Sequence, residues 1–169
     1  MMSNTNSCET RAGDSICSRC SLSGRTCCQW TEIFLTKGDV ERIAAAVGHD
    51  DFNEYKAIPK GIDLSTDPVW ALVFDKNGSR RILRREESGD CSFLGECGCT
   101  LSMEARPLLC RLYPFEYDVE GIKGVTANMC PEPENRNAPL LLALLNMNRD
   151  EAEVWRAMFY QEIREEFGY

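Results

Sequence analysis

Apolar side chains recur at helical spacing in one short stretch of the chain, residues 37–47. The positions that share this apolar face are Val40, Ile43, Ala44 and Val47. Thr36 precedes the stretch and Asp39 follows Thr36 after three positions, which is close to a capping box, while Gly48 supplies a stop. The pattern therefore predicts a helix over residues 37–47, and the apolar segment 31–35 before it predicts a short buried strand or extended segment.

The stretch after this helix predicts a further short helix and a β-hairpin. Residues 50–58 are compatible with a helix that ends before Pro59. Residues 69–74 are apolar and predict a strand, and Asp-Lys-Asn-Gly at 75–78 is a turn signal. Residues 80–85 place Ile82 and Leu83 between arginines, and we expect them to return as the partner strand of 69–74.

The C-terminal half predicts a second hairpin and then helices. Residues 115–119 face residues 122–126 across a Glu-Gly turn, which is a hairpin pattern. After a loop at 131–137, apolar residues spaced by three and four predict one or two amphipathic helices over 138–169, which we expect to pack as a lid on the core.

The number of cysteines distinguishes this chain from an ordinary small domain. Ten of the 169 residues are cysteine, more than average but below the roughly 8–10% that marks a secreted disulfide scaffold. The N-terminus shows no basic region followed by an apolar stretch, and the apolar run 139–145 is shorter than the about 20 residues that span a bilayer. We therefore expect a cytoplasmic protein, in which clustered cysteines indicate metal binding or catalysis rather than disulfides.

The net charge of the chain indicates which classes of partner it can bind. A formal net charge of −8 argues against a nucleic-acid partner, because affinity for phosphates rests on Lys and Arg. We expect the chain to bind a metal ion or cluster and to bind neither nucleic acid nor a membrane. A protein partner is possible, but the sequence does not identify one.

The first block of cysteines combines two spacings. Cys17-Ser-Arg-Cys20 is a CxxC pair, a spacing at which a tight turn directs two sulfurs to one ion. The vicinal pair Cys27 and Cys28 follows after six residues. Neighbouring side chains of an extended chain point to opposite faces, so this pair either shares a metal through a turn or serves two separate sites.

The second block lies more than sixty residues downstream in sequence, so folding must bring the blocks together if they share a centre. Its thiols are Cys91, Cys97, Cys99, Cys110 and Cys130. Pro107 and Pro114 are expected to interrupt regular structure there. The chain has a single histidine, His49, which argues against zinc sites with two histidines and against the facial triad of non-haem iron. Zinc held by four thiolates, or an iron–sulfur cluster, remains.

Several motifs resemble those of a known family. They are CSRCSLSGRTCC, EIFLTKGDVERIAAAVG, the turn with RIL, CSFL, and CTLSMEARPLLCRLYPF followed by MCP. Over about residues 17 to 131 the chain resembles the YkgJ-type cysteine cluster proteins, also called the CxxCxxCC family of zinc- or iron-chelating domains. The resemblance implies an eight-cysteine metal set, which maps onto Cys17, Cys20, Cys27, Cys28, Cys91, Cys99, Cys110 and Cys130.

Two features qualify this mapping. The gap before the vicinal pair is longer than is usual in the family, and Cys97 adds a thiol that is the alternative to Cys99 as ligand. Related cysteine patterns in flagellin lysine N-methylases imply an iron–sulfur cluster, of the 4Fe–4S type, although zinc stays open. Such a centre carries a net charge of about −2, and Arg106 and Arg111, which flank Cys110, are candidates to balance it beside the cofactor.

Three functions stay open at this point. The first is a metal-binding protein for electron transfer or metal handling. The second is a cluster-dependent enzyme, either redox-active or similar to a protein methylase, and the third is a thiol-based redox sensor. The chain contains no GxGxxG, P-loop, HExxH or nucleophile elbow, and no CxxxCxxC radical motif, so whether it is an enzyme stays uncertain.

The sequence as a whole predicts an α+β fold. We expect a small metal-stabilised single domain, with short β-hairpins around the cysteine cluster and flanking α-helices. Residues 1–15, rich in Ser, Asn and Thr, predict a flexible N-terminal segment. Residues 16–169 then make up one cysteine-cluster domain, with its C-terminal helices in 138–169.

Overall fold

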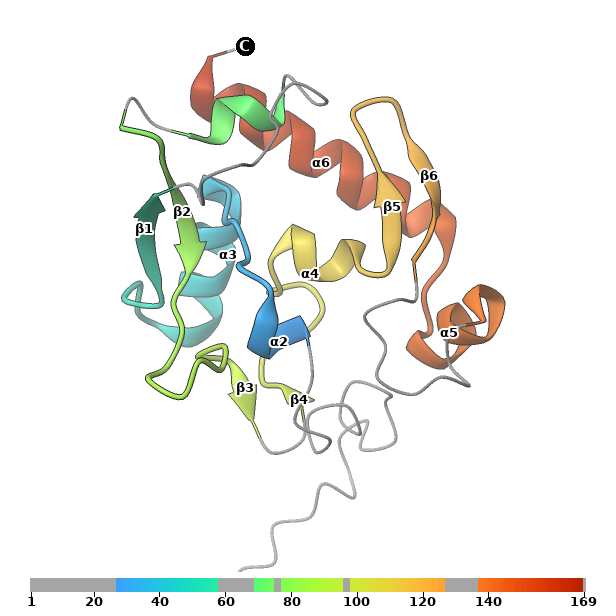
Figure 1. The fold of residues 1–169 in the computed structure, drawn as a ribbon, viewed down its shortest axis with the longest axis horizontal. Coiled ribbons are helices and arrows are strands. Elements are labelled where there is room, and N and C mark those ends of the chain that lie inside the picture. Colours follow the sequence, from blue (N-terminus) through green and yellow to red (C-terminus); the bar gives the residue numbers. More distant parts are fainter. Residues whose placement is uncertain (1–26, 58–68, 75–76, 96–97, 127–136, 169) are drawn as a thin grey trace, which may run out of the picture.

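The computed structural model describes residues 27–57, 69–74, 77–95, 98–126 and 137–168 (Figure 1). The helices in these ranges are α2 (Cys27–Trp30), α3 (Lys37–Val47), the 3-10 helix η2 (Trp70–Val73), α4 (Leu108–Leu112), α5 (Ala138–Leu145) and α6 (Arg149–Phe167). The strands are β1 (Asn53–Ala57), β2 (Ser79–Leu83), β3 (Leu94–Gly95), β4 (Gly98–Cys99), β5 (Phe115–Tyr117) and β6 (Ile122–Val125). The expected flexible segment 1–15 and the loop 131–136 lie outside the described residues.

In the described ranges the strands form the antiparallel pairs β1–β2, β3–β4 and β5–β6. Helices lie beside and between these short ribbons, with α6 crossing one side of the domain and α4 near its centre (Figure 1). This arrangement confirms the predicted α+β class. None of the described helices is both long and apolar enough to cross a bilayer.

Helix α3 begins and ends as its sequence predicts. The Thr36 side chain accepts a hydrogen bond from the Asp39 N–H, and the Asp39 carboxylate accepts one from the Thr36 N–H, which completes the capping box. Gly48 follows the helix with φ of 82°, a left-handed conformation that glycine adopts without strain.

The extended segment before α3 is also confirmed. Leu35 donates its N–H to the Arg81 carbonyl at 3.1 Å, and Leu83 donates to the Ile33 carbonyl at 2.8 Å. This segment therefore lies along one edge of β2, while β1 pairs with the other edge. The backbone of β2 is thus hydrogen-bonded on both sides.

Two local predictions in this region are wrong. Residues 53–57 form strand β1 rather than a helix, because pairing with β2 and the contact of Tyr55 with Arg81 outweigh local helical spacing. Residues 70–73 form η2 rather than the partner strand of 80–85. A short apolar run fits a buried helical turn as well as a strand, and Val69 and Val73 are buried here.

The second hairpin and the C-terminal helices are confirmed as β5–β6, α5 and α6. The sequence pattern did not reveal α4, which begins directly after Pro107, or the short pair β3–β4. Pro107 precedes α4 where its missing N–H is not needed, so it begins a helix instead of preventing one.

The buried apolar side chains form two groups. The first cluster comprises Phe34, Val69, Val73, Leu108, Leu112, Phe115, Ile122, Ala152, Phe159, Tyr160 and Ile163. The second cluster comprises Leu35, Ile43, Phe52, Leu83, Cys91, Phe93, Leu101 and Ala105. Phe34 and Leu35 are neighbours in an extended segment, so their side chains point to opposite sides and each enters a different cluster.

Helix α6 joins α3 through carboxylates. Glu166 accepts a hydrogen bond from the Lys37 N–H at 2.8 Å, and Glu162 accepts from the Thr36 hydroxyl and the Arg42 guanidinium. A side chain on Gly38 would meet the Glu162 carboxylate at 2.5 Å, so glycine leaves the room that this carboxylate occupies. Negative charge at the start of a helix is stabilising.

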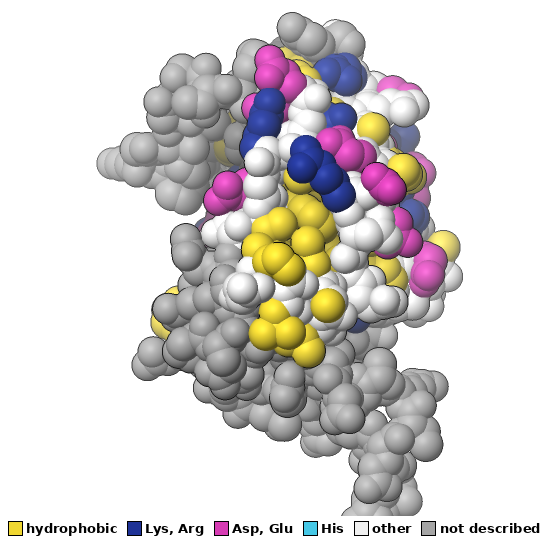
Figure 2. Space-filling view, turned by 90° about the vertical axis from the view of Figure 1, so that its right-hand side faces the viewer, with side chains coloured by type: hydrophobic (Ala, Val, Ile, Leu, Met, Phe, Trp, Pro, Cys, Tyr) yellow, Lys and Arg dark blue, Asp and Glu magenta, His cyan; other side chains and the backbone are white. Residues whose placement is uncertain are grey.

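An apolar surface lies on the side of the molecule that carries α5 (Figure 2). Hydrophobic side chains gather in the middle of this face, beneath a zone of mixed charges. Leu140 and Leu144 of α5 are among the exposed large apolar residues, as is Val154 of α6.

Candidate metal centre

The structure describes the side chains of four of the eight candidate ligands: Cys28, Cys91, Cys99 and Cys110. They come from α2, from the segment before β3, from β4 and from α4. Cys17, Cys20, Cys130 and the alternative ligand Cys97 lie outside the described residues. Cys27 begins α2, but its side chain is not among those described.

The two cysteine blocks meet through backbone contacts. Cys91 donates its N–H to the carbonyl of Cys28 at 2.9 Å. Arg85, just past β2, forms an isolated antiparallel bridge with Cys91. The end of β2 therefore brings Cys91 of the second block against α2, which carries Cys28 of the first.

Cys91 and Cys99 each have a backbone donor close by in the sequence. A backbone hydrogen bond from Phe93 lowers the pKa of Cys91, and one from Leu101 lowers the pKa of Cys99, in each case against the larger, raising effect of burial. In each case the N–H belongs to the residue two positions after the cysteine. Backbone N–H groups directed at sulfur stabilise thiolates and orient metal ligands.

Cys110 lies on α4, whose start is held by a buried carboxylate. Asp39 is fully buried and accepts a hydrogen bond from the Leu108 N–H at 2.9 Å. The same carboxylate accepts from Thr36 N–H at 3.2 Å and from Arg42 at 2.8 Å. Asp39 thus fixes α4, and with it Cys110, against α3.

The four described thiols share one electrostatic environment. Burial raises the pKa of Cys91 to about 11, raises that of Cys99 and raises that of Cys110 well above its ordinary value. For each of these three, the charges of other members of the set contribute to the higher pKa. A cation among these thiols would remove the repulsion and favour the thiolate forms.

Two arginines act on these sulfurs in the opposite direction. Arg106 lowers the pKa of Cys99, through its charge and a hydrogen bond, against the larger effect of burial. Its Nε also donates to the Leu101 carbonyl at 3.1 Å. Arg85 acts in the same way on Cys91, through its charge.

Arg111, the other expected charge-balancing residue, has a different set of contacts. It is 6% exposed and donates to the carbonyls of Arg106, at 2.8 Å, and Glu104. These bonds hold the loop between β4 and α4, so Arg111 shapes the segment that carries Arg106. Sequence reasoning missed Arg85, although strand alternation puts it on the same side as the buried Leu83.

The donor set fits zinc or an iron–sulfur cluster by its chemistry. Thiolates are the ligands of both, and backbone N–H groups and guanidinium groups surround the sulfurs. Within the described ranges, however, no three His, Cys, Asp or Glu side chains are arranged to hold a metal ion. Ligation by the described thiols therefore requires their side chains to turn toward a common point, or sulfurs from beyond these ranges.

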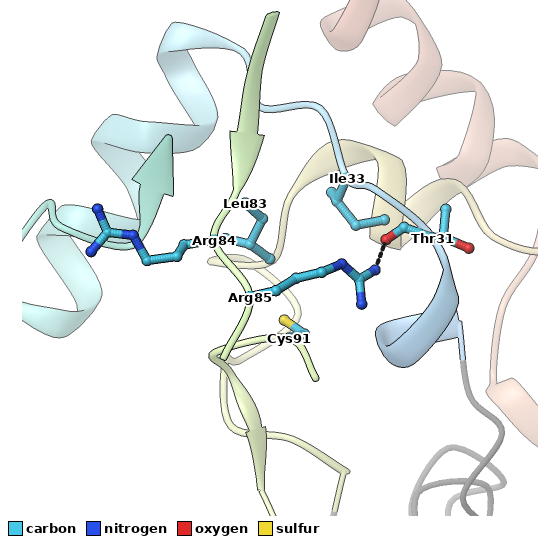
Figure 3. Close-up of a pocket in the computed structure, with 6 residues that line it drawn as sticks. All are labelled: Thr31, Ile33, Leu83, Arg84, Arg85 and Cys91. Carbon is cyan, nitrogen blue, oxygen red and sulfur yellow. Dashed lines mark hydrogen bonds between the residues drawn. The ribbon is translucent and has the colours of Figure 1, made fainter. Parts of the chain in front are cut away.

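A small pocket opens beside this region (Figure 3). It is lined by Thr31, Ile33, Leu83, Arg84, Arg85 and Cys91. The Arg85 side chain crosses it toward Thr31, above the Cys91 sulfur, whereas Arg84 points to the other side of the strand.

Comparison with protein-family models identifies the family of this chain. Residues 16–131 match the family model CxxCxxCC, which is described as a "putative zinc- or iron-chelating domain". The chain belongs to the CxxCxxCC family. The match includes both cysteine blocks, α2, α3 and α4, and it ends before α5 and α6. No curated protein and no solved structure matches the chain.

Proposed function

We propose that this CxxCxxCC protein holds an iron–sulfur cluster or zinc in an all-thiolate centre that includes Cys28, Cys91, Cys99 and Cys110. The main supporting observation is geometric: thiols from distant parts of the chain lie in one region, where Cys91 donates its N–H to the Cys28 carbonyl at 2.9 Å, and the charges of Cys28, Cys91 and Cys99 help to raise the pKa of Cys110. The family description independently supports zinc or iron as the metal. Cys17, Cys20, Cys27 and Cys130 complete the proposed eight-cysteine set.

The protein's own groups have separate tasks in this proposal. The Phe93 and Leu101 N–H groups orient the sulfurs of Cys91 and Cys99, and Asp39 holds the helix that carries Cys110. Arg85 and Arg106 offset the negative charge of the thiolates. A bound cluster would supply one-electron transfer, whereas zinc would supply structural closure or a form of metal handling.

Anaerobic purification followed by elemental analysis tests the proposal directly. Brown protein with iron, inorganic sulfide and broad absorption near about 400 nm indicates a cluster, and colourless protein with stoichiometric zinc indicates the zinc form. Protein that is folded, fully reduced and free of metal after growth with both metals would contradict the proposal.

Ligand variants then test the residues. Cys28→Ser and Cys110→Ser are expected to lower bound metal, because serine is a poor ligand for soft or borderline metals. Cys8→Ser is the matched control, since Cys8 lies outside the eight-cysteine set. Full metal content in both Cys28→Ser and Cys110→Ser would remove these residues from the ligand set.

The redox-sensor alternative finds no support at Cys91, Cys99 and Cys110. A sensor cysteine requires a lowered pKa and access to solvent. Burial raises the pKa of Cys91, Cys99 and Cys110, and Cys91 is 8% exposed. The methylase-like alternative requires binding of S-adenosylmethionine, which calorimetry measures directly.

A further inference from the structure

The helix that carries the vicinal cysteines is too short to hold its own position. Helix α2 spans only Cys27–Trp30, and its last turn contains no basic residue. The carbonyls at the end of any helix lack partners within the helix. A four-residue helix therefore depends on outside donors for both its backbone and its orientation.

Arg85 supplies these donors. Its Nη1 donates to the Cys28 carbonyl at 3.1 Å and to the Gly89 carbonyl at 2.5 Å, and its Nη2 donates to the Thr31 carbonyl. One guanidinium thus joins α2, the segment after α2 and the turn that leads to Cys91. Figure 3 shows the side chain extended across the pocket to Thr31, with the Cys91 sulfur beside its stem.

The same carbonyl of Cys28 also accepts the N–H of Cys91 at 2.9 Å. Arg85 and Cys91 face each other in an antiparallel bridge. The contacts of Arg85 therefore reinforce the backbone junction between the two cysteine blocks, on the side where Cys91 is buried.

We infer that Arg85 is a positioning residue of the thiolate centre: its guanidinium fixes the helix of Cys28 against the segment of Cys91 and places positive charge beside the sulfurs. This inference rests on the proposed function for its metal-binding part, while the junction itself belongs to the fold. It assigns a role to a residue outside the cysteine motifs.

The planar guanidinium explains why this position needs arginine. Its two terminal nitrogens reach three carbonyls that lie in different directions, whereas a lysine offers the charge from one point only. A lysine at this position would keep the charge but lose part of the junction. Substitution by lysine can therefore separate the contribution of the positive charge from that of the hydrogen bonds to the three carbonyls.

The neighbouring Arg84 provides a matched control. It carries the same charge, lies one position away, is exposed and points to the other side of the strand. Its backbone N–H donates to the Phe52 carbonyl at 2.7 Å, and this bond is independent of the side chain. Arg84→Met and Arg85→Met thus remove the same charge from the same strand end.

The first measurement is amide hydrogen exchange at Cys91 in the protein as purified. Arg85→Met is expected to speed exchange there by about tenfold or more over wild type and Arg84→Met, because the junction opens more often. Exchange in α6, far from the junction, serves as the check that the variant is folded. Equal Cys91 exchange in both variants, with α6 still protected, would overturn the inference.

The second measurement is titration with Co²⁺, which reports thiolate ligation through sulfur-to-metal charge-transfer absorption. We expect Arg85→Met to weaken Co²⁺ binding by about 10–100-fold, as for other groups that orient metal ligands, and Arg84→Met to leave it unchanged. Arg85→Lys is expected to fall between wild type and Arg85→Met. Unchanged affinity in Arg85→Met would overturn the positioning role.

The two measurements separate this inference from the proposed function. If wild-type protein fails to give the Co²⁺ bands, the proposed metal centre is wrong, and the exchange experiment still decides whether Arg85 holds the junction. If the bands form in every variant with equal affinity, the metal centre stands and the role of Arg85 is wrong.

Discussion

The first cluster contains no described cysteine, whereas the second counts Cys91 among its buried members and packs against Cys28 and Cys99. Aromatic rings dominate the first: Phe159 meets Phe34 edge to face at 6.2 Å and Tyr160 at 5.4 Å. In the second, Phe52 and Phe93 form the ring contact, at 5.6 Å. One cluster is therefore held by apolar packing, and the other includes groups that ionise and bind metals.

This difference indicates how each cluster responds to metal. A protonated thiol behaves as a small hydrophobe, so without metal the sulfurs of the second cluster contribute only apolar packing. Ligation would replace this packing by bonds of much greater strength. The first cluster contains no cysteine among the described residues, so we expect its stability to depend less on metal than that of the second cluster.

Removal of the metal is the largest expected perturbation. Chelation should speed amide exchange across 91–105 by several orders of magnitude, because a structural thiolate site contributes about 10 kcal/mol or more at neutral pH. Exchange in the middle of α6 should change little. Equal loss of protection in both clusters would show that the two are not separable in stability.

The substitution Phe159→Ala is expected to have the next largest effect on stability. Phe159 is 1% exposed in the first cluster, and loss of a buried ring costs about 3–5 kcal/mol. Urea unfolding followed by circular dichroism should show this loss with and without metal. Val154→Ala, on the exposed face of the same helix, is the control and should cost less than about 0.5 kcal/mol.

Asp39→Ala tests the contact through which Asp39 of α3 holds the start of α4. It leaves the buried N–H groups of Leu108 and Thr36 and the Arg42 guanidinium without this acceptor, so we expect a loss of about 2–4 kcal/mol. Metal affinity should fall as well, since α4 carries Cys110. The exposed Glu41→Ala is the control. A large loss of stability with unchanged affinity would restrict Asp39 to a structural role.

The smallest expected effect is a pH dependence at Glu32. Hydrogen bonding to Lys56 lowers the pKa of Glu32 below its ordinary value of 4.5, and Arg80 at 3.3 Å adds to this. A lowered pKa in the folded state means that the stabilisation is complete above about pH 4.5 and is lost as pH falls through the lowered pKa.

Glu32→Gln should therefore reduce the free energy of unfolding at pH 7 by no more than about 1 kcal/mol, because the pair is partly exposed. The difference from wild type should shrink as the pH is lowered to about 3. Thermal unfolding at the two pH values measures both quantities, and an equal difference at each would contradict the assigned ion pair.

Elements with complete local signals were predictable from sequence. Helix α3 has a capping box at Thr36 and a glycine at its end, and β5–β6 surround a short turn. The strand β1 was not predictable, since its residues are mostly exposed and its conformation comes from pairing with β2. The pattern of 50–58 alone was compatible with a helix.

The residues of the candidate site also divide into those that the sequence predicted and those that it did not. Cysteine spacing and family resemblance suggested Cys28, Cys91, Cys99 and Cys110, and the structure brings these thiols into one region, while their ligation stays a prediction. Arg85 and Asp39 could not be assigned from spacing, because each acts through a backbone group distant in sequence: Arg85 at Cys28 and Asp39 at Leu108. Contacts of this kind depend on the tertiary fold.

The family match ends at residue 131, yet α6 supplies Ala152, Phe159, Tyr160 and Ile163 to the first cluster. A polypeptide truncated at that boundary would leave Leu108 and Leu112, beside Cys110 on α4, open to solvent. Contiguous apolar surface of this kind promotes self-association. The smallest stably folded unit is therefore longer than the matched range, and recombinant expression should retain residues 138–168.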